Sequence, residues 1–209
     1  MKYLMNSGGG YMNGYQNFVK LFGSGIFIES NKIKKNYSMQ KALSSLYIIP
    51  IFFKRIYYIP KNRERKGHFI ENKQDFFSSL FNLKYGRKQW YWALSTAARY
   101  YGLEWSTTRI LEIVNKEKTK VINISDRISS LKGKSSYRSE TLAQFYDSLN
   151  VNIIYLHKGK QKNFKSIMID DVIGPVCSKN LLLTDIKMYR SKVRHQGLKK
   201  IYSRILEEF

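Results

Sequence analysis

The chain has 209 residues, with 37 Lys and Arg against 15 Asp and Glu, and therefore a net charge of +22. This length suits one large domain or two small ones. A hydrophobic fraction of 43% is enough for a real core, which argues against a disordered chain. A positive charge of this size favours a polyanionic partner, chiefly nucleic acid. An AT-rich genome would also raise the lysine content, but it would not explain the shortage of acidic residues.

The charge and the apolar residues are unevenly spread. Residues 1–70 carry 12 basic and 2 acidic residues and are the most cationic third of the chain. No run of 18 apolar residues occurs, so we expect no membrane contact. The start of the chain lacks the apolar centre of a signal peptide, and Cys177 is the only cysteine. These features together predict a cytoplasmic protein.

In chain order, the first third predicts three short helices and then a β-ribbon. The helices are expected over 12–22, 30–35 and 38–47, the last capped by Ser38. Pro50 ends it, and the β-prone runs 51–53 and 56–59 follow around Lys54 and Arg55. This order is typical of a winged helix-turn-helix, in which a helix enters the major groove and the ribbon contacts the flanking backbone. An ordinary helix followed by a core strand with a cationic turn is the alternative. The charged segment 61–68 is expected to be a linker.

The rest of the chain predicts a second, α+β region. It is expected to begin with a helix over 72–83, a strand over 90–92 and a helix over 94–101. A hairpin of strands 109–115 and 119–124, a loop over 125–136 and a helix over 139–149 are expected next. The last expected elements are a pair of strands over 151–157 and 163–170, which Pro175 ends, and helices over 178–189 and about 198–205. The fold class is therefore α+β, with a winged helix-turn-helix at 1–68 and a mixed α+β domain with antiparallel strand pairs at 69–209.

The candidate site residues are all in the first third. Gln40, Ser44 and Ser45 of the third helix would contact bases, and Lys41 together with the cations of the ribbon and the linker would contact phosphates. The predicted DNA-binding residues are Gln40, Lys41, Ser44, Ser45, Lys54, Arg55, Lys61, Arg63 and Arg65.

Motifs for an active site are few. The three histidines are far apart and Cys177 is alone, so no metal or cofactor site is expected. The pair Asp170–Asp171 is a weak indication of a metal-dependent nuclease, with Asp185 as a remote partner. Neighbouring strand residues point to opposite faces, however, so the two carboxylates do not readily share one ion.

Three segments resemble the AbiEi-family antitoxins of type IV toxin–antitoxin systems. RIYYIPKN at 55–62 is similar to the family's arginine-rich wing, and WYWALSTAARYYGL at 90–103 is similar to its aromatic strand and Ser/Ala helix. VCSKNLLLTD at 176–185 resembles a third segment. The chain departs from the pattern at the wing, which lacks the usual glycine, and at Lys179–Asn180, where the family carries Glu-Arg.

The resemblance implies a protein that is not an enzyme. It would bind repeats in its own promoter as duplex DNA, repress that promoter, and oppose a nucleotidyltransferase toxin, with direct toxin contact left open. A monomer and a dimer are both compatible with it. A stand-alone winged-helix regulator, an RNA-binding protein and a nucleic-acid-processing enzyme remain alternatives.

Overall fold

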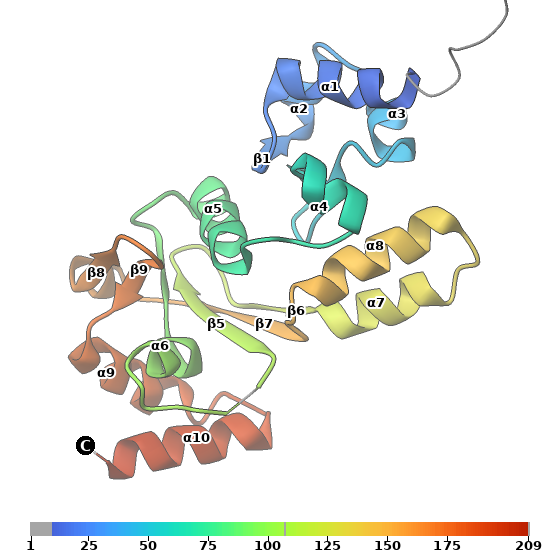
Figure 1. Ribbon diagram of the computed structural model, residues 1–209. Helices are drawn as coiled ribbons and strands as arrows, with labels where there is room; N and C mark the ends of the chain where they lie inside the picture. Colours follow the sequence, from blue (N-terminus) through green and yellow to red (C-terminus); the bar gives the residue numbers. More distant parts are fainter. Residues whose placement is uncertain (1–9, 107, 209) are drawn as a thin grey trace, which may run out of the picture. The chain divides into compact units, whose positions relative to one another are not determined.

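The computed structural model describes residues 10–106 and 108–208, and for residues 10–13 it describes the backbone alone. The fold is mixed α+β, which confirms the expected class at that level. The chain forms two compact units: unit 1 comprises Met1–Glu71 and Lys134–Ser148, and unit 2 comprises Asn72–Gly133 and Leu149–Phe209. Figure 1 shows the elements of both.

Unit 1 combines short helices with a three-stranded antiparallel sheet. Its elements in order are α1 (Gly10–Phe22), β1 (Ile26–Glu29), α2 (Ser30–Lys34), α3 (Met39–Ser44), β2 (Ile49–Pro50), β3 (Ile56–Ile59), α4 (Asn62–Gly67) and α8 (Tyr137–Ser148). The strand order is β1-β3-β2, with Ile26 opposite Ile59 and Ile49 opposite Tyr58.

Aromatic and β-branched residues make the core of unit 1. Phe18, Ile33, Ile48 and Ile59 are fully buried in it. The ring of Phe18 lies 4.9 Å from that of Tyr37 in an edge-on contact, a geometry that aromatic rings favour. The short helices α2 and α3 are therefore stabilised by tertiary packing, since helices of five or six residues are not stable alone.

Two expectations for unit 1 are wrong. Residues 61–68 are not a linker, because α4 forms there around the buried carboxylate of Glu64. That carboxylate accepts hydrogen bonds from the Lys61 amide and the Tyr58 hydroxyl, both at 2.7 Å. The run 51–53 is not a strand: β2 ends at Pro50, and the three apolar side chains that follow are buried in the turn before β3.

Unit 2 is built on a six-stranded mixed sheet in the order β6-β7-β5-β4-β9-β8. The strands are β4 (Trp90–Trp92), β5 (Ile110–Asn115), β6 (Lys120–Asn123), β7 (Ile153–Lys158), β8 (Ile167–Asp170) and β9 (Gly174–Cys177). Its helices are α5 (Lys73–Tyr85), α6 (Leu94–Tyr100), α7 (Ile124–Lys132), α9 (Lys179–Tyr189) and α10 (Gln196–Glu207), and a 3-10 turn, η1, spans Gln161–Lys165.

The helices cover both faces of this sheet. Trp90 and Trp92 point to one face, where both rings pack on Phe81 of α5. Tyr91 points to the other face, where its hydroxyl donates to Asp185 of α9. Figure 1 accordingly shows α5 on one side of β5 and β7 and α6, α9 and α10 on the other.

The expected strand pairings of unit 2 are wrong. Strands β5 and β6 do not form a hairpin, because β7 lies between them, parallel to β5 and antiparallel to β6. Nor does β7 pair with β8, which lies at the opposite edge beside β9.

Two smaller expectations also fail. The segment 125–136 is not a loop, since α7 begins where the Asn123 side chain accepts the Asp126 amide at 3.2 Å. Pro175 lies inside β9, and β9 pairs with β4 only from Val176, so the missing proline amide breaks no ladder there.

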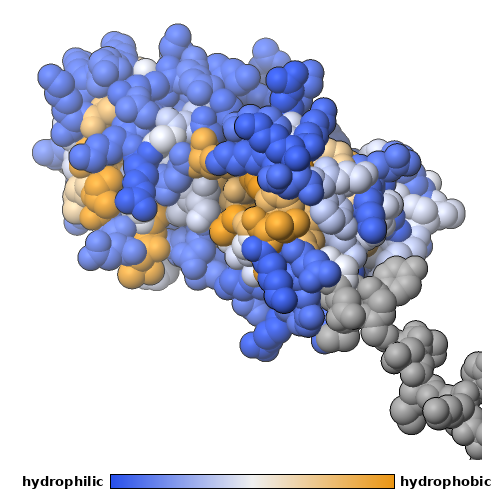
Figure 2. Space-filling view, turned by 90° about the horizontal axis from the view of Figure 1, so that it is seen from above, coloured by the Kyte–Doolittle hydropathy of each residue, from blue (hydrophilic) through white to orange (hydrophobic). Residues whose placement is uncertain are grey.

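One face of the molecule is mostly hydrophilic. Figure 2 shows one face, where hydrophobic side chains gather in separate patches within a mostly hydrophilic surface. In the part of the chain that is described, no helix has the length and apolar character needed to cross a membrane.

Candidate nucleic-acid interface

The helix α3 presents a polar face to solvent. Its first turn is capped by Ser38, whose hydroxyl oxygen accepts the Lys41 amide at 3.3 Å. Ala42 is fully buried in the core of unit 1. The predicted residues Gln40 and Lys41, just before Ala42, and Ser44, two residues after it, are exposed. An amide, an ammonium group and a hydroxyl therefore share the outer face of one short helix.

Ser45 is less exposed than Gln40, Lys41 and Ser44, and is therefore less able to contact DNA. It caps the C-terminus of α3 and is partly buried. Its carbonyl oxygen accepts a hydrogen bond from Arg65 at 3.4 Å. Of the four DNA-binding residues predicted on this helix, three are thus on its exposed face and one is at its end.

The turn between β2 and β3 carries two exposed cations, Lys54 and Arg55. Arg55 has a φ of 66°, a left-handed conformation that is uncommon for a non-glycine residue. Its carbonyl accepts the Ser30 amide at 2.9 Å, which ties the turn to the start of α2. Arg55 and Lys34 of α2 line the same small pocket of about 400 Å³.

Sequence reasoning missed the lysines of α2. Lys32, Lys34 and Lys35 are all exposed, just before α3 in the chain. The sequence shows three lysines within the four residues 32–35, which could have indicated a phosphate-binding segment. Among the helices of unit 1, only α3, which follows this run, was assigned to the site from the sequence. These three lysines, like Lys41, Lys54 and Arg55, form no ion pair with any described residue.

The predicted cations around α4 differ in their exposure and in their contacts within unit 1. Lys61 and Arg63 are exposed and lie 3.4 and 3.7 Å from the carboxylate of Glu71. Exposed ion pairs of this kind are weak, so both side chains can exchange Glu71 for a phosphate.

Arg65 instead packs within unit 1. Its guanidinium lies 4.8 Å from the ring centre of Tyr15 and 5.5 Å from that of Tyr47. Burial also raises the pKa of Tyr15 to about 12, with Arg65 opposing that rise, so the ring stays a neutral phenol beside the cation. Arg65 is therefore occupied by internal contacts, unlike the other predicted cations.

The second polar cluster of the molecule is buried, in unit 2. The Glu112 carboxylate accepts the Ser95 amide at 3.0 Å, the Ser95 hydroxyl at 2.6 Å and the Tyr202 hydroxyl, and it lies 3.2 Å from His157 Nε2. Three donors from α6 and α10, together with the imidazole of His157 on β7, thus converge on one residue of β5. All of these side chains are less than a tenth exposed, so this arrangement stabilises the unit rather than meeting a ligand.

Asp185, at the end of the segment 176–185, has a buried carboxylate. Burial raises its pKa from 3.8 to about 6, against the hydrogen bond from Tyr91 and the nearby His157. Its contact with the Tyr91 hydroxyl, at 2.8 Å, brings together the segments 90–103 and 176–185.

Asp170 has a local structural role. Its carboxylate accepts the amides of Val172 and Ile173 at 2.9 Å and the Tyr100 hydroxyl at 2.8 Å, and these donors lower its pKa. Within residues 10–106 and 108–208, no three His, Cys, Asp or Glu side chains are grouped so that they could hold a metal ion.

Comparison with known proteins gives no match. No protein-family model, no curated protein and no solved structure is similar to this chain. The function is therefore argued from the residues and their geometry.

Proposed function

We propose that unit 1 is a winged helix that binds duplex DNA, with α3 in the major groove. Two features support this. The element order α1-β1-α2-α3-β2-β3 with strand order β1-β3-β2 is the arrangement expected of a winged helix. The observation that carries the proposal is the division of α3, which buries Ala42 and exposes Gln40, Lys41 and Ser44.

Each exposed group of α3 has a specific chemical use on DNA. The Gln40 amide both donates and accepts, which matches the N6 and N7 groups of adenine in the major groove. The Ser44 hydroxyl donates to the Lys41 carbonyl at 3.2 Å, and its oxygen can accept from a base edge. Lys41 is a point charge suited to a phosphate, as are the cations of α2.

The β2–β3 turn would contact the flanking backbone. Lys54 and Arg55 are exposed at its tip, and the turn is tied to α2 through the hydrogen bond to the Ser30 amide. The α2 lysines and the turn would therefore lie along phosphates while α3 reads bases. This arrangement separates affinity from specificity, as is usual for DNA-binding proteins.

The biological role we propose is repression of the protein's own promoter. The experiment is a fluorescence-anisotropy titration of the full chain on its own upstream DNA and on a scrambled duplex, at about 150 mM salt. We expect clearly tighter binding to the upstream DNA. Equal affinity for the two duplexes would leave only general charge attraction and would refute the repressor.

A double substitution separates base reading from charge. Gln40→Ala with Ser44→Ala removes no charge and leaves Ala42 buried, so the fold and the salt dependence should persist while the preference for the upstream DNA falls at least tenfold. The matched control is Ser191→Ala with Gln196→Ala, two exposed polar residues of unit 2. A preference retained by the α3 variant would exclude α3 as the reading helix.

The antitoxin role rests on the resemblance of three segments alone. We propose it as the reason for autorepression, since the gene of a nucleotidyltransferase toxin would then be cotranscribed. Co-expression with the neighbouring gene tests it: rescue from growth arrest would support an antitoxin. The absence of a toxic neighbour would favour a stand-alone regulator.

A further inference from the structure

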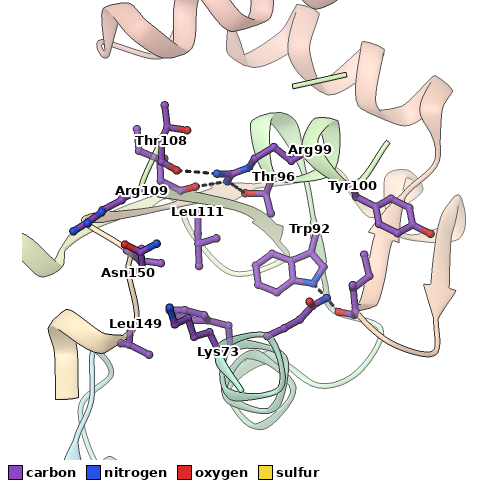
Figure 3. A pocket seen from close by; sticks show the side chains of 15 residues that line it. Lys73, Trp92, Thr96, Arg99, Tyr100, Thr108, Arg109, Leu111, Leu149 and Asn150 are labelled. Carbon is purple, nitrogen blue, oxygen red and sulfur yellow. Dashed lines mark hydrogen bonds between the residues drawn. The ribbon is translucent and has the colours of Figure 1, made fainter. Parts of the chain in front are cut away.

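Unit 2 contains a cleft of about 560 Å³ that the DNA-binding proposal does not use. Its walls come from α5, β4, α6, the start of β5 and the segment before β7, all within unit 2 (Figure 3). Small-molecule sites in proteins have volumes of about 300–1,000 Å³, so the size suits a single small ligand.

The lining of the cleft is cationic. It includes Lys73, Arg99 and Arg109 and no carboxylate. Lys73 and Arg109 are exposed and form no ion pair with any described residue. Such a lining attracts an anion and contains nothing that repels one.

Arg99 is a fixed cation in the wall. Its guanidinium donates to the Thr108 carbonyl at 2.8 Å and to the Ile110 carbonyl, and it lies 3.4 Å from the Thr96 hydroxyl (Figure 3). Two carbonyls orient the group, and the charges of Glu112 and Glu104 act on it without forming an ion pair. Its charge is therefore held beside the cleft and is not neutralised by direct contact with a carboxylate of the described residues.

The rest of the lining is apolar and in part aromatic. Trp92 is held in place because its indole nitrogen donates to the Ile173 carbonyl at 2.8 Å and its ring packs edge-on against Trp90 at 5.1 Å. Phe77 and Leu111 complete this wall. A flat, rigid surface of this kind suits a planar ring, because ring and wall lose little conformational freedom on contact.

The polar groups lie around the apolar wall. In Figure 3, Arg109, Asn150 and Lys73 lie toward one end of the cleft, Tyr100 lies toward the other, and Trp92 lies between them. A ligand that used the whole site would have an anionic group at the first end and a planar apolar body over Trp92. Asn150 and Thr108 are placed to exchange hydrogen bonds with its polar edges.

We propose that this cleft binds a nucleoside phosphate. The phosphate would contact Lys73 and Arg109, and the base would lie against Trp92 and Leu111. The inference is independent of the DNA-binding proposal, since it uses no residue of unit 1. It gives unit 2 a role as the sensing part of the chain.

The test is isothermal titration calorimetry of the full chain with AMP, GMP and UMP, and with inorganic phosphate and adenosine as partial ligands. We expect saturable 1:1 binding of at least one mononucleotide, with either partial ligand at least tenfold weaker. Lys73→Ala with Arg109→Ala should weaken binding at least tenfold. Leu111→Trp, which fills the cleft, should abolish it.

A charge-matched control excludes general attraction to this cationic chain. Lys187→Ala with Arg190→Ala removes the same charge from exposed positions of unit 2 outside the cleft and should change affinity less than twofold. If Leu111→Trp fails to fold by circular dichroism, the two charge variants decide the matter.

Four results would overturn the proposal. They are no saturable binding up to about 1 mM mononucleotide, equal weakening in the control variant, phosphate binding as tightly as the nucleotides, and binding of single-stranded oligonucleotides without any mononucleotide. The third would leave an anion site only, and the last would indicate RNA instead.

Discussion

The salt dependence of DNA binding is the most direct measure of the proposed interface. The proposed interface has eight exposed cations, five of them predicted from the sequence and three from α2: Lys32, Lys34, Lys35, Lys41, Lys54, Arg55, Lys61 and Arg63. Each phosphate contact on duplex DNA contributes about 0.9 to the slope of log affinity against log salt, so the five predicted cations alone give a slope of about −4.5 and all eight give about −7. Removing the two turn cations, by Lys54→Ala with Arg55→Ala, should flatten the slope by about 1.8.

The assay is anisotropy of a labelled duplex at several salt concentrations between about 50 and 300 mM. The matched control is Lys20→Ala with Lys66→Ala, which removes two exposed charges of unit 1 outside the proposed face and should leave the slope within about 0.5 of the original. Thermal melting checks that each variant is folded. An unchanged slope in the turn variant, or an equal change in both variants, would remove the β2–β3 turn from the interface.

Three further predictions concern residues within the fold. Arg65→Ala should lower the free energy of unfolding by about 1–2 kcal/mol, because its contacts with two rings are lost, and should change the salt slope by less than about 0.5. A change of about one unit in that slope would instead show that Arg65 contacts a phosphate. Asp185 binds its proton more tightly in the folded state, so the free energy of unfolding should fall by up to about 3 kcal/mol as the pH rises from about 4 to about 6. In urea titrations, Asp185→Asn should abolish that fall. The same pH profile in the variant would contradict the burial argument. Glu112→Ala should cost about 3–5 kcal/mol in urea unfolding because it leaves three buried donors without an acceptor; a loss below about 1 kcal/mol would show that water replaces the carboxylate.

Local signals predicted the starts of α3, α5 and α9 well, whereas α8 begins at Tyr137, two residues before the expected helix. Ser38 caps α3 and Ser178 caps α9, each by accepting the amide three residues on. The helix expected at 72–83 is α5, at Lys73–Tyr85, capped by Asn72. These features depend on side chains within one turn of the helix start, so neighbouring sequence is sufficient to predict them.

Strand pairing was not predictable in the same way. Strands β5 and β6 are separated by four residues that resemble a hairpin turn, yet β7, some thirty residues later, lies between them. Hydrophobic alternation indicates that a segment is a strand but not which strand it pairs with. Helix α7 was missed because its residues are mostly polar and only Ile124 and Ile128 are buried.

The candidate site was predictable only in part. Exposure of Gln40 and Ser44 follows from helical spacing around Ala42. The internal position of Arg65 depends on Tyr15 and Tyr47, which are 50 and 18 residues away in the chain. Glu112 likewise occurs in an apolar strand with no nearby partner, because its donors come from residues 17, 45 and 90 positions away.

The brevity of α3 limits what one molecule can recognise. Six residues extend about 9 Å along the helix axis, which matches about three steps of the DNA double helix at 3.4 Å each. A DNA sequence of about three base pairs recurs by chance about every 64 base pairs, which is far too often to identify one promoter. The proposed repressor would gain specificity by placing two copies on adjacent repeats, and the spacing between repeats in the operator would then encode the distance between the paired helices.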